Sequence, residues 1–315
     1  MVKSKIINLL KQQTILLILL FLFVFLIIVS PSFREPRNFY NLIRKVSAIG
    51  IMSCGLTLPI VSGGLDLSVG SLFSLTGILA VMWSPNGLFI AIVIPIIIAC
   101  LVGILNGFII SKFNVNPVIV TLGMLSVLQG AVLIITGGGN KMVNPGSNYL
   151  KIAGGNFLGI SNQTVIFIFI VIVLYILLHR TTMGRYIYLL GSNAEAAVIS
   201  GIRIDRLRMI AYAISAICAA IAGIVVSSNV SYGMPYAGQG WEFEALTAVL
   251  IGGNAIAGGK GSIYNTILGV FMLAIIINGM ILLNLPYATQ IILKGFLLML
   301  AVILDARSRL REQIV

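Results

Sequence analysis

Apolar runs with the length of a membrane span recur along this chain, and they restrict its fold more than any other feature. A helix needs about 20 apolar residues to cross a hydrocarbon core about 30 Å thick. Only 9% of the 315 residues are charged, against about 25% in soluble globular domains. We therefore expect an all-α integral membrane protein with about ten transmembrane helices, some of them broken by Pro or Gly. The predicted spans are 14–29, 46–62, 66–83, 88–111, 117–136, 164–179, 209–228, 243–258, 263–283 and 287–304.

The first three spans need further interpretation. Three lysines precede the first span, as in the charged region of a signal peptide. No A-x-A-like cleavage site follows it and many more spans do, so we favour an uncleaved anchor. The boundary between the second and third spans is the least defined, because Pro59 and the pair Gly63-Gly64 interrupt one continuous apolar stretch.

The distribution of basic residues predicts which side of the membrane each connection faces, because cytoplasmic loops carry an excess of Lys and Arg. With ten spans both ends of the chain are cytoplasmic. Of the 20 basic residues, thirteen then fall inside and six outside, with Lys294 within a span. Four of the outer ones crowd into 31–45, which is either an outer loop or an amphipathic segment in the interface. The prediction is one transmembrane domain, 1–315, with cytoplasmic segments 1–13, 180–208 and 305–315.

The sequence lacks the patterns of an enzyme. The nearest approach to a phosphate-binding G-x-x-x-x-G-K-[ST] motif is 254–262 (NAIAGGKGS), which has Asn at the first Gly position and Gly after the Lys. We expect a tight turn between two helices there. The single histidine, His179, ends an apolar run, which argues against a Ser/His/Asp arrangement. We therefore expect a transport subunit with no ATPase site, no cofactor and no metal, and we interpret the net charge of +12 as topology and not as nucleic-acid binding.

Polar residues within the spans are candidates for a transport pathway. Buried amides either join helices through hydrogen bonds or face a wet pathway, and an amide pathway suits an uncharged, hydroxyl-rich solute. The carboxylate beside the Gly63-Gly64 break has the alternative role of capping the next helix. Since nearly all carboxylates lie near span ends or in connections, ion-coupled transport is the weaker hypothesis. The candidate pathway residues are Asp66, Asn106, Gln129, Asn278 and Gln290.

The basic inner connection 180–208 contains a short predicted helix at 193–199 (NAEAAVI), with Ser192 or Asn193 as its N-cap. Ala194, Ala197 and Val198 are predicted to share one face. Such a helix either docks in a groove of a cytoplasmic partner or is only an amphipathic loop helix.

Several motifs, in this order, resemble those of ribose-type sugar permeases of ATP-binding cassette importers, which belong to the branched-chain amino acid/ribose permease family. The resemblance extends over about 40–306. It departs from the family pattern at Gly253-Asn254-Ala255, where family members commonly carry Gly-Thr-Ser. The motifs are 62–71 (SGGLDLSVGS), 182–202 (TMGRYIYLLGSNAEAAVISGI), 250–253 (LIGG), 257–261 (AGGKG), 278–279 (NG) and 301–305 (AVILD).

This resemblance implies a subunit of a bacterial cytoplasmic-membrane importer for a monosaccharide. Two permease chains, expected as a homodimer, would form the pore, and a cytoplasmic ATPase would drive alternating access. An extracytoplasmic sugar-binding protein would meet the outer connections 137–163 and 230–241. The alternatives are a nucleoside, signalling-furanone or branched-chain amino acid permease, and an ion-coupled transporter. The residues implied in coupling to the ATPase are Gly191, Asn193, Glu195, Ala196, Ala197 and Gly201.

Overall fold

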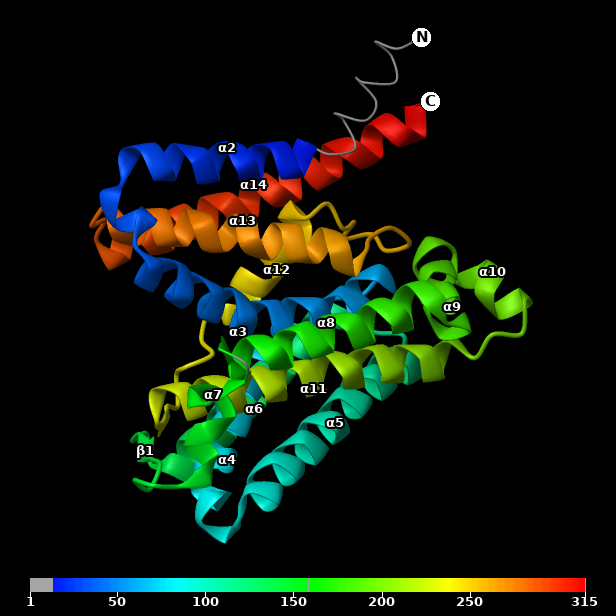
Figure 1. Cartoon of the computed structure of the whole chain (residues 1–315). Coiled ribbons are helices and arrows are strands. Elements are labelled where there is room, and N and C mark those ends of the chain that lie inside the picture. Colours follow the sequence, from blue (N-terminus) through cyan, green and yellow to red (C-terminus); the bar gives the residue numbers. More distant parts are fainter. Residues whose placement is uncertain (1–13, 158, 315) are drawn as a thin grey trace.

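The computed structural model describes residues 14–157 and 159–314, and most of these residues lie in helices that run side by side (Figure 1). Each predicted span overlaps a helix, which confirms the all-α membrane class. The predicted cytoplasmic segment 1–13 lies outside the described residues. The ten helices are α2 (Thr14–Val29), α3 (Pro36–Val61), α4 (Val69–Trp83), α5 (Leu88–Phe113), α6 (Pro117–Thr136), α8 (Asn162–Arg180), α11 (Ile204–Val230), α12 (Trp241–Ile251), α13 (Ile263–Leu282) and α14 (Tyr287–Ile314).

Seven of the helices in the described chain are long and apolar enough to cross a membrane, while α2, α4 and α12 are shorter. With 11 residues, α12 is about 16 Å long, roughly half of a hydrocarbon core. The prediction of a span over 243–258 was therefore wrong in extent, because the chain turns at Gly252 and Gly253. At the other end, α3 begins at Pro36, so 36–45 belongs to this helix and forms neither an outer loop nor a separate interfacial segment.

Two ends of the bundle are distinguishable in Figure 1. The beginning of α2, the end of α14 and the short helices α9 (Thr182–Ser192) and α10 (Ala194–Ile199) lie at one end. Strand β1 (Lys141–Met142) and helix α7 (Lys151–Gly154) lie at the opposite end. This arrangement agrees with an even number of crossings. The remaining short elements are η1 (Pro31–Arg34), η2 (Ser84–Asn86), η3 (Asn148–Leu150), β2 (Asn156–Phe157), β3 (Ile160–Ser161) and β4 (Tyr232–Gly233).

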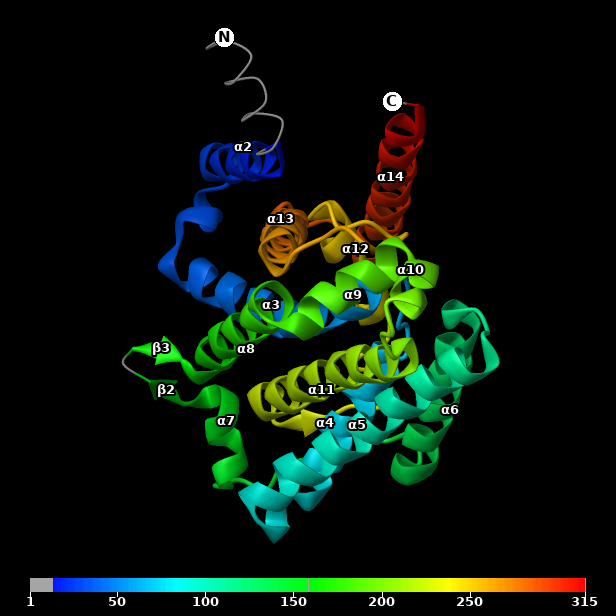
Figure 2. The ribbon, with the colours of Figure 1, turned by 90° about the vertical axis from the view of Figure 1, so that its right-hand side faces the viewer.

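Helix α11 forms the centre of one half of the bundle, where it packs on α3, α4 and α5. Gly103 and Gly107 on α5 allow the two backbones to approach, since a Cβ at Gly103 would lie 2.7 Å from the Cα of Ala213. Such small-residue spacing is a common means of packing membrane helices. In the other half, α2 and α14 stand on either side of α13 (Figure 2). Helix α14 is mostly exposed over Tyr287–Arg307, where only 6% of the most apolar 18-residue stretch is buried.

The connection between α6 and α8 is fixed to the end of α11 through residues around Tyr149. The Tyr149 hydroxyl lies 2.7 Å from Ser227 Oγ and donates to the carbonyl of Ile224 at 3.0 Å. Ser228 Oγ donates to the carbonyl of Tyr149 at 2.7 Å. Strand β1 pairs with β4, which follows α11. The connection is therefore a folded cap on this end of the bundle.

Candidate functional site

The segment that leads into α12 enters the bundle. Tyr232 and Tyr236 are exposed, but Gly233, Pro235 and Gly238 are buried. The backbone N–H of Gly238 donates to Ser74 Oγ on α4 at 2.8 Å. The connection 230–241 is therefore exposed only in part, with Tyr236 and Gln239 exposed and Gly238 buried, and its contact with a binding protein stays a prediction. Because this segment descends into the bundle, α12 begins inside the protein.

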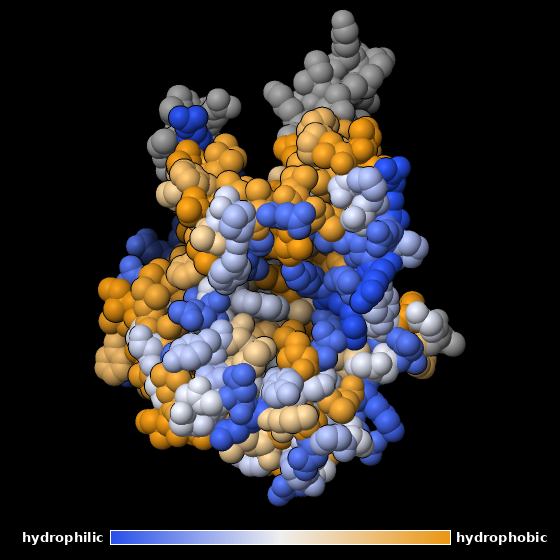
Figure 3. All heavy atoms as spheres, turned by 90° about the vertical axis from the view of Figure 1, so that its left-hand side faces the viewer, coloured by the Kyte–Doolittle hydropathy of each residue, from blue (hydrophilic) through white to orange (hydrophobic). Residues whose placement is uncertain are grey.

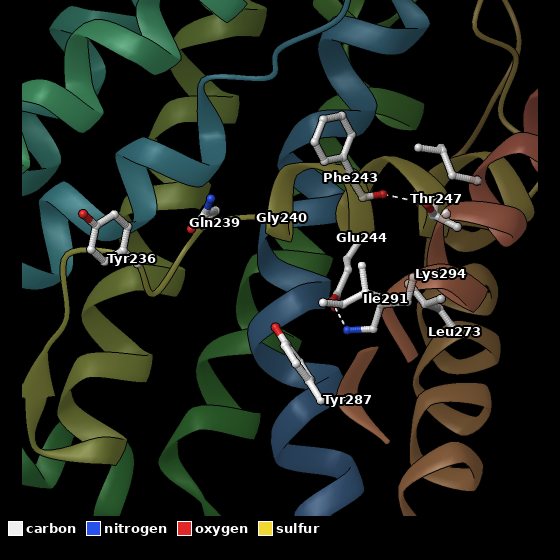
Figure 4. Close-up of a pocket in the computed structure, with 12 residues that line it drawn as sticks. Tyr236, Gln239, Gly240, Phe243, Glu244, Thr247, Leu273, Tyr287, Ile291 and Lys294 are labelled. Atoms are coloured by element: carbon white, nitrogen blue, oxygen red, sulfur yellow. Dashed lines mark hydrogen bonds and ion pairs between the residues drawn. The ribbon is translucent and has the colours of Figure 1, made fainter. Parts of the chain in front are cut away.

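A cavity of about 790 Å³ lies between α12, α14 and the segment that precedes α12. In Figure 4, Glu244 on α12 points toward Lys294 on α14, while Tyr236 and Gln239 lie on the entering segment. Apolar side chains such as Leu273 and Ile291 complete the wall. The polar side chains that line the cavity are Tyr236, Gln239, Glu244, Thr247, Tyr287 and Lys294.

Glu244 and Lys294 form an ion pair that joins α12 to α14. Their side chains are only 19% and 24% exposed, respectively. A third charge, Lys45 on α3, is near enough to interact electrostatically with both. Charges at this depth of a membrane protein are costly unless paired, and they mark functional sites. The cavity therefore presents a carboxylate that accepts hydrogen bonds and an ammonium group that donates them.

The position of Lys294 in the sequence is a signal for this pair. Lys294 is the one basic residue placed within a predicted span, and such a residue requires a partner. Glu244 was classed with the carboxylates near span ends, because span 243–258 was taken to begin beside it. The real helix begins within the bundle, so Glu244 lies deeper than its sequence position indicates.

Two of the predicted pathway residues, Asp66 and Asn106, meet in one buried cluster. Ser68 Oγ donates to Asp66 Oδ1 at 2.6 Å, and Asn106 Nδ2 donates to Ser68 Oγ at 3.0 Å. The backbone N–H of Ser68 also donates to Asp66 Oδ1 at 3.2 Å. Asp66 thus holds the turn that leads into α4, as the capping alternative expects. All three residues are fully buried.

The other three pathway candidates also bond to neighbouring segments. Gln129 on α6 donates to the carbonyl of Pro235 at 3.2 Å. Asn278 on α13 donates to Asn38 Oδ1 on α3 at 2.8 Å and accepts a bond from the Asn38 amide at 3.2 Å. Gln290 donates to the carbonyl of Leu285 at 2.9 Å. None of the five candidates lines the cavity. Gln129 bonds to Pro235, which directly precedes the lining residue Tyr236.

The predicted short helix of the inner connection is present as α10. Asn193 is its N-cap, since Asn193 Oδ1 accepts a hydrogen bond from the backbone N–H of Ala196 at 2.9 Å. Glu195 is exposed in the first turn, Ala196 is half-buried and Ala197 is fully buried. Gly201 follows the helix with φ +75°.

The residues of the predicted apolar face of α10 differ in burial, and docking of this face on a partner stays a prediction. Ala197 packs inward, but Val198 is 53% exposed and Ile199 is 87% exposed. Helix α10 lies at the end of the molecule (Figure 1), so these two branched apolar side chains are exposed there. Most of the remaining inner connection is also helical, because α9 continues directly from α8 after Thr181.

Comparison with known proteins identifies the family. Residues 38–302 match the family described as branched-chain amino acid transport system / permease component. The chain belongs to this family. The ribose import permease protein of Bacillus subtilis is 37% identical over 91% of both chains, and that of Escherichia coli K12 is 34% identical over 95% of both. The L-arabinose ABC transporter permease of Azospirillum brasilense is 29% identical over 96% of this chain and 89% of its own. No solved structure matches.

Because the chain belongs to this permease family and has seven apolar helices long enough to span a membrane among its described residues, it is a multi-pass protein of the bacterial inner membrane. Its departure from the family pattern at 253–255 has a structural explanation. Asn254, only 1% exposed, donates to the carbonyl of Val249 at 2.7 Å and to Thr266 Oγ1 at 3.0 Å. Asn254 Oδ1 accepts from the backbone N–H of Ser262 at 2.6 Å. One amide thus closes the turn between α12 and α13.

Proposed function

We propose that this permease is the membrane-spanning subunit of an ATP-binding cassette importer for a monosaccharide, a ribose-like pentose or a related sugar. The observation that carries the proposal is the set of relatives named for the import of ribose, L-arabinose and xylose, which align with 90% or more of this chain. The family description names branched-chain amino acids, and this is the second candidate substrate class.

The cavity between α12 and α14 favours a neutral, hydroxylated solute. Small-molecule sites are typically pockets of about 300–1,000 Å³ with a few convergent polar groups, and this cavity is about 790 Å³. Glu244 and Lys294 neutralise each other while offering both acceptors and donors. In the proposed path the solute passes these two residues with Gln129 at the edge. Asp66, Asn106 and Asn278 bond to neighbouring parts of the bundle, while Gln290 bonds to the turn that precedes its own helix.

A second copy of the chain completes the proposed pore. Two lining residues, Tyr236 and Tyr287, are 55% and 73% exposed, so the cavity is open on this side. The adjoining face of α14 carries exposed apolar residues, including Phe296 and Leu300. Figure 3 shows hydrophobic lobes projecting at the top of the molecule with a furrow between them. A homodimer with α14 near its axis would place two such cavities together.

The two ends of the bundle have separate proposed partners. At the α10 end, exposed Val198 and Ile199 beside Glu195 suit docking into a groove of a cytoplasmic ATPase, with Gly191, Asn193, Ala196, Ala197 and Gly201 shaping the segment. At the other end, the folded cap around Tyr149 suits contact with a sugar-binding protein. ATP-driven closure of the ATPase pair would then change the side to which the cavity opens.

The test is purification of the permease from its native membrane in mild detergent. We expect a stoichiometric cassette ATPase to co-purify, and uptake into proteoliposomes to require ATP, this ATPase and a binding protein loaded with sugar. Uptake of leucine or valine in place of sugar would support the second substrate class. Uptake by the chain alone, without any ATPase, would contradict the importer assignment.

A further inference from the structure

Three backbone segments from distant parts of the sequence meet beside α10. They are the end of α3 with the residues after it (61–63), the last turn of α9 (188–192), and the turn between α12 and α13 (257–261). The backbone N–H of Gly259 donates to the carbonyl of Val61 at 2.8 Å. The Tyr188 hydroxyl donates to the carbonyl of Gly261 at 2.7 Å. We refer to these three segments together as the glycine joint.

The joint is packed backbone against backbone, and glycine is required for this packing. A Cβ at Gly191 would overlap the carbonyl oxygen of Val61 and the nitrogen of Gly259. A Cβ at Gly258 would lie 2.7 Å from the Cα of Gly63 and 3.0 Å from the Cα of Gly191. Because the obstacles are backbone atoms, no rotation of a side chain relieves these contacts. Gly258 and Gly259 also have φ of +85° and +72°, which glycine adopts without strain.

The hydrogen bonds of the joint persist over the physiological pH range. Burial raises the pKa of Tyr188, which lies outside the membrane-spanning helices on α9. The hydroxyl therefore stays protonated and remains a donor to the Gly261 carbonyl. The second bond, from Gly259 to Val61, is between backbone groups that do not titrate.

The position of the joint links the two parts of the candidate site. On one side, Ser192 is followed directly by Asn193, the N-cap of α10. On the other side, the 257–261 turn follows α12, and Asn254 fixes that turn to Val249 within the helix. Glu244 lies about two helical turns before the end of α12. A displacement of α10 would therefore reach α12 through the backbone contacts of the joint and through the side chains of Tyr188 and Asn254.

We propose that the glycine joint is the rigid connection through which movement of α10 reaches α12 and the Glu244–Lys294 pair, with Gly191, Gly259 and Tyr188 as its positioning residues. Packed elements respond to small displacements as units, and α12 is short enough to tilt as one body. The proposal rests on the proposed function, since it assumes that α10 receives its movement from an ATPase.

The test measures sugar imported per ATP hydrolysed in proteoliposomes that contain the complete complex and loaded binding protein. In Gly191→Ala, we expect ATP hydrolysis to continue while this ratio falls by about tenfold, a typical coupling between two sites. In Tyr188→Phe, which adds no atoms, we expect a fall of about threefold from the loss of one hydrogen bond. The matched control is Gly130→Ala on α6, where a Cβ meets nothing within 4 Å.

The outcomes separate this proposal from the proposed function. Wild-type complex without ATP-dependent sugar uptake would overturn the proposed function itself. With an active wild type, an unchanged ratio in both variants, or a proportional loss of uptake and hydrolysis, would overturn the joint as a coupling element. If Gly191→Ala does not fold, Tyr188→Phe decides alone. Alanine has a higher helix propensity than glycine, so a defect in Gly191→Ala would not arise from helix propensity.

Discussion

Replacing Lys294 with Met tests whether the ion pair holds α12 and α14 together. The change leaves the Glu244 carboxylate, 19% exposed, without its ion-pair partner, and Lys45, which interacts with it at longer range, remains. Breaking a fully buried pair costs about 3–5 kcal/mol, and an exposed pair contributes about 0–1 kcal/mol. Since both side chains are about four-fifths buried, we expect a loss of about 2 kcal/mol in the free energy of unfolding.

The double variant Glu244→Gln/Lys294→Met is the matched control. It removes both charges and leaves no carboxylate unpaired, so we expect its stability to return to within about 0.5 kcal/mol of the wild type. With the single variant Glu244→Gln added, the three variants form a double-mutant cycle whose coupling energy isolates the interaction. We expect sugar uptake to remain low in all three, because the double variant lacks the charged groups that would contact the solute.

The assay is thermal or denaturant unfolding of the purified permease in nanodiscs, with uptake measured on the same preparations. A coupling energy below about 0.5 kcal/mol would refute the reasoning, because the two charges would then act independently. Wild-type uptake by the double variant would show that the pair is structural only and would remove it from the proposed path.

Three further predictions concern other parts of the chain. In Asn254→Ala, the loss of three buried hydrogen bonds should cost about 3 kcal/mol in unfolding experiments; a change below about 1 kcal/mol would contradict the role of this amide in the turn. In Ile199→Asp, a charge replaces a side chain that is 87% exposed, so we expect an unchanged unfolding temperature but loss of the ATPase from the purified complex; retention of the ATPase would remove α10 from that interface. In intact cells, an impermeant thiol reagent should label Asn148→Cys but label Asn193→Cys only after the membrane is opened; the reverse pattern would invert the topology.

The sequence predicted the helices well because hydropathy depends on local composition, which the membrane constrains strongly. It predicted the position of α10 and narrowed its cap to Ser192 or Asn193 for the same reason, since capping is decided within four residues. Which residues of this six-residue helix pack against the rest of the chain was not predictable, because that depends on neighbours far away in sequence; the structure buries Ala197 and leaves Val198 exposed.

The pairing of Glu244 with Lys294 was not predictable from local pattern, because the partners are 50 residues apart and lie on helices whose depths were unknown. Hydropathy treats a short helix and an apolar turn as one span. It therefore merged α12 with the apolar residues around the turn at Gly252 and Gly253, and placed Glu244 at a membrane surface. Counting basic residues predicts on which side of the membrane a connection lies, but it does not predict how deep a residue lies within the membrane.

The shortness of α12 connects the two parts of the site. A full span would have placed its first turn at the outer surface and would have left no room for the partly buried segment at 235–240. Because α12 begins within the bundle and ends shortly before the 257–261 turn of the glycine joint, it is short enough to move as a unit between the ATPase end and the cavity. Its upper end is held by the pair with Lys294, and its lower end by Asn254 and the joint. Any movement of α10 transmitted through the joint must therefore strain or displace the ion pair. For this reason we expect the pair to be altered during the transport cycle and not only to stabilise one state.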